Sequence, residues 1–148
     1  MNNNLMNYQK VQVTTADRLK LVVMLYDGAI SFLKTALKYL EKNDMAGKGM
    51  YIAKAQDIID ELNNSLNLEE GGEIAVNLRK IYNFIYFYLV KANISKDPKM
   101  IKEVIGILST LKEAWEEISK NPQLNQEHQN DNSVIYDNTE KTIGELKI

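Results

Sequence analysis

The sequence predicts an all-α protein: an antiparallel, up-down four-helix bundle with a flexible N-terminal arm and a mostly disordered C-terminal tail. The 148 residues include only two prolines and seven glycines, which favours long helices with few breaks. Four stretches repeat apolar residues at alternating steps of three and four, which is the pattern of one helix face. The segments between these stretches are short, so consecutive helices are expected to run antiparallel. We assign residues 1–13 to the arm, 14–121 to the bundle and 122–148 to the polar tail.

The composition is that of a globular domain large enough to bury a core. Apolar residues make up 45% of the chain and charged residues 26%. The net charge of −2 gives no electrostatic reason to expect nucleic-acid or anionic-lipid partners. The absence of cysteine excludes disulfides and thiolate chemistry. The first ten residues, MNNNLMNYQK, have neither a basic start nor an apolar stretch behind it, so we expect no secretion signal.

The first helix is predicted to start at residues 14–17, where Thr14 and Asp17 form a helix-start signal. Its apolar seam comprises Leu19, Val22, Tyr26, Ala29, Leu33, Ala36 and Leu40. Leu21, Leu25, Phe32 and Tyr39 widen that seam on one side. Only one strip is clearly polar, made of Lys20, Asp27, Ser31, Lys34, Lys38 and Glu41. More than half of this helix surface is therefore expected to be covered.

The second and fourth helices carry narrower apolar stripes. Asn43-Asp44 breaks the chain before a stripe of Tyr51, Ile52, Ala55, Ile58, Ile59, Leu62 and Leu66. A turn is predicted at residues 69–72, where two glycines follow two glutamates. Asp97-Pro98 provides a cap and a first-turn proline for the last helix. That helix has the seam Ile101, Val104, Leu108, Leu111, Trp115 and Ile118, and Asn121-Pro122 ends it.

The third helix, predicted over residues 73–95, is more apolar than one buried face requires. Residues 81–94 read IYNFIYFYLVKANI, a run too short for the roughly 20 residues of a membrane-spanning helix. The predicted core stripe is Ile74, Leu78, Ile81, Ile85, Leu89 and Ala92. Val76, Phe87, Val90 and Ile94 lie roughly on the opposite side. In a four-helix bundle one of two opposed faces must stay exposed or contact a partner.

No pattern of residues indicates an enzyme. The only histidine, His128, is in the tail, so neither a di-iron nor a Cys/His zinc site can be assembled. Residues 47–49, Gly-Lys-Gly, lack the spacing of a phosphate-binding loop. The carboxylates Asp57, Asp60 and Glu61 fit a solvated helix face. We therefore predict no catalytic residues, no metal and no cofactor.

Several blocks of the sequence resemble the FliS family of flagellar secretion chaperones. They are TADRLKLVVMLYDGA at 15–29, AQDIIDEL at 55–62, GEIAVNL at 72–78 leading into Ile81-Tyr82, and the segment 103–115. Tyr8, followed by Val13 and Thr15, also fits the family pattern. The resemblance covers about residues 7–119. The chain departs from it at Asp17-Arg18, where the family has Ser-Pro, at residues 86–88, and in its longer tail.

The resemblance implies a cytoplasmic export chaperone. Such a protein binds the C-terminal helical segment of flagellin, prevents premature polymerisation and keeps flagellin competent for flagellar type III export. The implied partners are the flagellin C-terminal segment and the flagellar export apparatus, with neither nucleic acid nor membrane insertion. The work requires reversible burial of apolar helix faces in grooves of the bundle and no catalysis.

The residues expected to bind a partner are apolar or aromatic. They are Tyr8, Leu21, Leu25, Phe32, Ile58, Leu62, Val76, Tyr82, Phe87, Val90 and Ile94. For Met24, Leu25, Ile58, Leu62 and Tyr82, each taken singly, ordinary core packing is favoured over partner contact. A homodimer contact is the rival interpretation for Phe87 and its two tyrosine neighbours. The alternative functions are a self-associating helical adaptor without a flagellin client and a helical enzyme with an unrecognised site.

Overall fold

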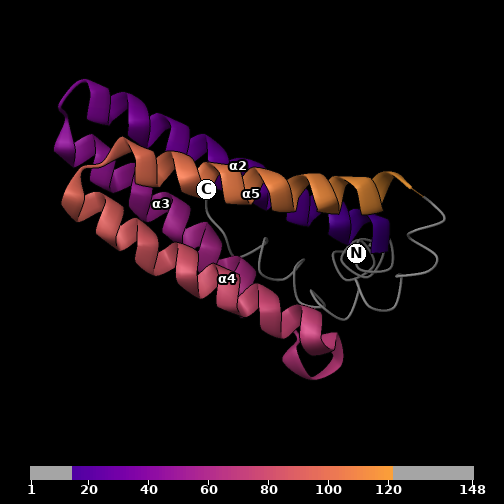
Figure 1. Cartoon of the computed structure of the whole chain (residues 1–148). Helices are drawn as coiled ribbons and strands as arrows, with labels where there is room; N and C mark the ends of the chain where they lie inside the picture. Colours follow the sequence, from indigo (N-terminus) through magenta and orange to yellow (C-terminus); the bar gives the residue numbers. More distant parts are fainter. Residues whose placement is uncertain (1–14, 122–148) are drawn as a thin grey trace, which may run out of the picture.

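A computed structural model describes residues 15–121, which form four helices joined by short connections (Figure 1). In chain order they are α2 (Thr15–Glu41), α3 (Met45–Asn64), α4 (Leu68–Ser95) and α5 (Pro98–Lys120). The predicted all-α, four-helix class is confirmed. The predicted arm and tail, and with them Tyr8, lie outside the described residues. None of the described helices is long and apolar enough to cross a membrane.

Short polar side chains cap the starts of three helices. The Asp44 side chain accepts a hydrogen bond from the Gly47 amide at 2.9 Å, and Asp97 accepts one from the Lys99 amide at 2.9 Å. Asn67 caps α4 by accepting from the Glu70 amide at 3.1 Å. These bonds satisfy amides that have no partner inside the helix. The predicted breaks at Asn43-Asp44 and Asp97-Pro98 are therefore confirmed, and each works through its aspartate.

The start of α4 differs from the prediction. The helix begins at Leu68, five residues before the predicted Glu73, but its backbone is not helical at Gly72, where φ is 60° and ψ is −141°. A positive φ of this kind is tolerated by glycine because it has no Cβ. The predicted turn at residues 69–72 is thus a single helical turn that ends in a kink. Beyond Gly72 the helix runs to Ser95, and Lys96 closes it in the left-handed conformation with φ 57°.

Each helix buries one face in a common core, and the predicted seams supply most of it. The core includes Leu19, Val22, Leu33, Ile52, Ile59, Ile85, Leu89, Ile101, Val104 and Leu108. The predicted polar strip of α2, from Lys20 to Glu41, is exposed. A small polar group joins α2, α4 and α5 inside this core: the hydroxyls of Tyr26 and Tyr82 are hydrogen bonded, and Trp115 Nε1 donates to the Tyr26 hydroxyl at 3.3 Å.

Two residues expected in the core are on the surface. Ile74 is 50% exposed because it follows the Gly72 kink, at the end of the bundle where α4 runs away from α5 (Figure 1). Met24 is 63% exposed. It lies midway between the buried Val22 and Tyr26, and at 100° per residue that midpoint is the opposite side of α2.

The helices are not packed equally closely. Helix α2 packs extensively against α3 and α5, whereas α4 packs against α3 and much less against α5. Figure 1 shows α4 diverging from α5 toward the end where α4 begins. No helix within residues 15–121 covers the outer side of α4, where Phe87 and Ile94 are exposed.

Candidate partner-binding surface

Four exposed apolar side chains lie along one side of α4, in a row interrupted by Lys80 and Asn83, and we call this row the α4 outer stripe. Its members, with their exposed fractions, are Val76 (42%), Phe87 (65%), Val90 (39%) and Ile94 (77%). The opposite face of the same helix buries Leu78, Tyr82, Ile85 and Leu89. The predicted opposition of two apolar faces is confirmed for these residues. Large apolar side chains that remain exposed in a row are typical of interaction sites.

Polar contacts with α3 fix the rotation of α4 and keep the stripe outward. Gln56 Nε2 donates to the backbone oxygen of Tyr86 at 3.1 Å. Asn63 Nδ2 donates to Asn83 Oδ1 at 2.8 Å, and Arg79 Nε donates to Asn63 Oδ1 at 3.2 Å. A roll of α4 that buried the stripe would break all three hydrogen bonds. The stripe is therefore a fixed feature of the surface.

On the α5 side, an aromatic pair flanks the stripe. The ring of Phe84 stacks on Tyr88 with centroids 5.1 Å apart, and Phe84 is 53% exposed. The Tyr88 hydroxyl donates to the Glu103 carboxylate of α5, and this hydrogen bond raises the pKa of Tyr88. The apolar stripes predicted for this helix do not include Phe84. The signal was present in its spacing of four residues from Tyr88.

The charges that α4 itself carries along the stripe all have one sign. From Ile74 to Lys96 the chain contains no carboxylate and four cations, Arg79, Lys80, Lys91 and Lys96. Lys80, Lys91 and Lys96 are exposed. The α4 outer stripe is therefore an apolar row with a positive border, a combination that favours acidic amphipathic segments.

The α2 candidates separate into surface and core. Leu21 and Phe32 are half-buried, whereas Leu25 is only 5% exposed. Phe32 belongs to what we call the α2–α3 aromatic cluster, made of Phe32, Tyr39, Tyr51 and Lys54. The centroids of Phe32 and Tyr51 are 6.0 Å apart, and Lys54 Nζ lies 5.5 Å from the Phe32 centroid. This cluster is a second aromatic surface on different helices from the stripe.

A glycine makes the aromatic cluster possible. The ring of Tyr39 stacks on Tyr51 with centroids 5.4 Å apart, and it lies directly against Gly47. A Cβ at position 47 would lie 2.4 Å from Tyr39 Cδ1, which is impossible without displacing the ring. The sequence draws attention to Gly47 only as part of a Gly-Lys-Gly stretch without the spacing of a phosphate-binding loop, so this packing role was missed.

Four candidate residues lie in the core, and their assignment as direct contacts needs correction. Leu25, Ile58, Leu62 and Tyr82 are at most 5% exposed. The reason for Ile58 is the closeness of α2 and α3, since a Cβ on Gly28 would lie only 3.1 Å from Ile58 Cδ1. No partner can contact these four side chains in this conformation. They support the exposed surface from beneath.

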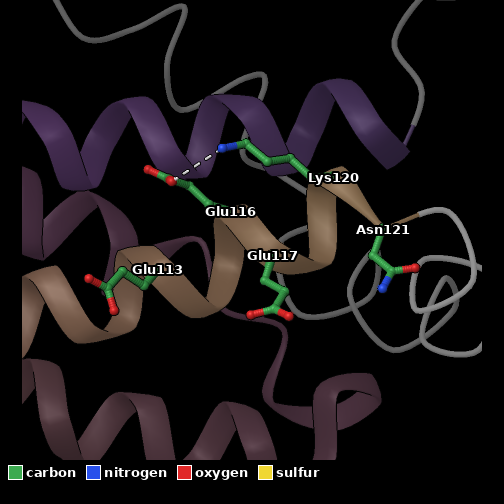
Figure 2. A pocket seen from close by; sticks show the side chains of 5 residues that line it. All are labelled: Glu113, Glu116, Glu117, Lys120 and Asn121. Carbon is green, nitrogen blue, oxygen red and sulfur yellow. Dashed lines mark ion pairs between the residues drawn. The ribbon is translucent and has the colours of Figure 1, made fainter.

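Two hollows on the described surface are lined mainly by charged side chains. Figure 2 shows one at the end of α5, lined by Glu113, Glu116, Glu117, Lys120 and Asn121. Glu116 and Lys120 are ion-paired there at 3.7 Å. Between α2 and α5, Lys112 Nζ lies 2.5 Å from Asp27 and 3.3 Å from Glu116, and its pKa is raised chiefly by Asp27. Within residues 15–121 no group of three metal-ligating side chains occurs. These hollows hold internal ion pairs.

Comparison with known proteins gives one consistent family. A family model described as "Flagellar protein FliS" matches residues 1–122. The flagellar secretion chaperone FliS of Salmonella typhimurium is 44% identical over 108 residues, covering 72% of this chain and 80% of that protein. The protein of the same name from Vibrio cholerae is 37% identical, covering 80% of this chain and 90% of that protein. The one from Bacillus subtilis is 37% identical, covering 74% and 81% respectively.

Proposed function

This chain belongs to the flagellar protein FliS family, and from that premise we propose that it is a cytoplasmic flagellar export chaperone that binds the C-terminal helical segment of flagellin. By covering that segment it prevents premature polymerisation and keeps flagellin competent for type III export. The observation that carries the proposal is its 44% identity to a flagellar secretion chaperone over 108 residues. The α4 outer stripe and the α2–α3 aromatic cluster are the surfaces that suit such a client.

The mechanism requires only reversible burial. An amphipathic helix of the client places its apolar face on an apolar surface of the bundle and is thereby kept from other flagellin molecules. The α4 outer stripe offers about 400 Å², or roughly 10 kcal/mol of gross burial energy at about 25 cal/mol per Å². Association and ordering of the client consume about 4–15 kcal/mol. One stripe is marginal, so the client must contact several surfaces.

The role of each candidate residue follows from its exposure. Phe87 and Ile94 are the most exposed members of the stripe and are assigned direct client contact, together with Val76 and Val90. Leu21 and Phe32, which are half-buried on α2, are assigned a second contact. Tyr8 in the arm is assigned to the same client site on the family pattern alone. The further partner is the export apparatus, and the chain performs no catalysis.

The test is a binding measurement with two forms of flagellin. We expect a 1:1 complex with full-length flagellin and loss of binding when its last 50 or so residues are removed. Phe87→Glu should weaken the complex, whereas Lys102→Glu, which changes an exposed residue on α5, should not. Equal binding of full-length and truncated flagellin would rule the proposal out.

The exposed stripe also favours a second candidate, a self-associating adaptor that uses Phe87 in a homodimer. Sedimentation of the protein alone separates the two. A stable dimer that Phe87→Glu dissociates, together with no flagellin binding, would support the adaptor.

A further inference from the structure

The border of the α4 outer stripe restricts what can cover it. Phe87 and Ile94 are 65% and 77% exposed, and the helix around them carries cations and no carboxylate from Ile74 to Lys96. A good occupant therefore combines apolar side chains with net negative charge. The occupant must also be narrow, because the stripe is a single row of side chains that runs along the helix axis.

One segment of this chain has that chemistry. Residues 122–148, outside the described residues, contain two lysines and five carboxylates: Glu127, Asp131, Asp137, Glu140 and Glu145. Two apolar groups interrupt this acidic sequence, Val134-Ile135-Tyr136 and Ile143, Leu146 and Ile148. The first group is bordered by Asp131 and Asp137. The second group has Glu140 before it and Glu145 within it, but Lys141 and Lys147 balance these two charges. The acidic border around the first group is the complement of the stripe.

The connection to the bundle places this segment within reach. Helices α4 and α5 are antiparallel neighbours, so α5 ends at Lys120 at the same end of the bundle at which α4 begins (Figure 1). The stripe runs from Val76 to Ile94, about 27 Å at the rise of an α-helix. The thirteen residues from Pro122 to Val134 span up to about 45 Å when extended. Both apolar groups can therefore reach the stripe.

A second copy of the chain suits the stripe less well. A stable dimer interface buries about 800 Å² on each partner, roughly twice the 400 Å² that four such side chains offer. Two copies facing each other on this helix would also bring together two borders that are both positive. A tethered segment meets neither difficulty, since an effective concentration on the order of millimolar lets a small contact form.

We propose that the tail, residues 122–148, docks on the α4 outer stripe of its own chain through its two apolar groups, with its carboxylates facing Lys80 and Lys91. The contact is weak and intramolecular. It covers the apolar row in the free protein and has to be displaced by any partner that uses the row. The inference goes beyond the chaperone function and holds whatever the client is.

The absence of cysteine makes a direct test simple. Asn138→Cys, between the two apolar groups, carries a nitroxide in the full-length protein, and amide NMR signals report its proximity. At millimolar effective concentration, a contact with a dissociation constant of about 0.1 mM is formed about nine-tenths of the time. We therefore expect strong broadening at residues 83–94, and none along the polar strip of α2 around Ser31 and Lys34.

Charge reversal provides the matched control. Lys80→Glu with Lys91→Glu should weaken docking about tenfold, which lowers the docked fraction from about nine-tenths to about one-half and reduces the broadening of the α4 signals. Lys34→Glu with Lys38→Glu, an equal change of charge on the exposed strip of α2, should leave the broadening intact. Broadening that is absent, that falls on another face, or that is not reduced by the Lys80/Lys91 change overturns the proposal. Broadening transferred to an unlabelled, isotope-enriched copy would identify a second copy as the occupant and overturn it equally.

Discussion

Inside the core, two tyrosine hydroxyl groups and an indole join three helices. Tyr26 and Tyr82 have no exposed surface, and their hydroxyls bond each other while Trp115 Nε1 donates to Tyr26. Buried polar groups cost stability unless they are hydrogen bonded, so this group fixes how α2, α4 and α5 meet. From sequence, Tyr26 and Trp115 belonged to core seams, but the seams could not show that their polar atoms meet.

Removing one hydroxyl measures that contribution. We expect Tyr82→Phe to lower the free energy of unfolding by about 1–2 kcal/mol, because a buried hydrogen bond is lost without a change in shape. Tyr86→Phe, at a half-buried position of the same helix, should change it by less than about 0.5 kcal/mol. Urea denaturation measures both. Equal effects of the two substitutions would mean that the buried hydroxyl pair contributes nothing specific.

A buried lysine gives a pH-dependent prediction. Lys48 is only 2% exposed, its Nζ donates to the backbone oxygen of Asn93 at 2.8 Å, and burial followed by the charge of Lys96 lowers its pKa below the ordinary 10.5. At pH values between the lowered pKa of folded Lys48 and the ordinary 10.5, the unfolded chain therefore binds more protons than the folded one. The contribution of Lys48 to the free energy of unfolding must then rise with pH across that range.

The predicted outcome is that Lys48→Met flattens this rise. Lys34→Met, at an exposed position, should keep the wild-type dependence. Denaturation curves at about pH 7, 9 and 10.5 provide the comparison. If Lys48→Met leaves the slope unchanged, the ammonium group is not desolvated in the folded protein.

Among the helices, α4 differs from the others because it has two apolar faces, one buried in the core and one exposed. Ile85 is fully buried and Phe87 is 65% exposed, although they are two residues apart. The core face holds the bundle together, and the outer face is available to a partner.

Substitution by glutamate should separate the two faces. Ile85→Glu places an unpaired carboxylate in the core and should cost more than about 4 kcal/mol, enough to unfold the bundle. Phe87→Glu should leave the helix content unchanged and alter stability by no more than about 1 kcal/mol. Circular dichroism decides. An unfolded Phe87→Glu protein beside a folded Ile85→Glu protein would reverse the assignment of the faces.

The elements themselves were largely predictable because apolar spacing and capping residues are local properties of the sequence. The seams of α2, α3 and α5, and the cap at Asp97, follow from them directly. The position of Ile74 does not, since it depends on the conformation of Gly72 and on where α5 leaves α4. Periodicity also identifies a face without showing which neighbour covers it. Ile58, Leu62 and Tyr82 could therefore not be separated from true surface residues.

For the whole molecule, the feature that matters is unequal helix packing. Helix α2 is held closely by α3 and α5, whereas α4 diverges from α5 toward the end where α4 begins (Figure 1). Within residues 15–121 no helix covers the outer row of α4, which faces away from the core. Apolar surfaces thus occur on α4 and between α2 and α3. A client that wraps over several surfaces can gain enough burial to overcome the cost of ordering, which one surface alone does not provide.

We propose that these surfaces hold the C-terminal helical segment of flagellin. The most direct test is calorimetric titration of the full-length protein with full-length flagellin and with flagellin lacking its last 50 or so residues. We expect a 1:1 complex with full-length flagellin, with a negative heat-capacity change from burial of apolar surface, and no measurable heat with the truncated form. Heats of equal size and stoichiometry for the two forms of flagellin would contradict it.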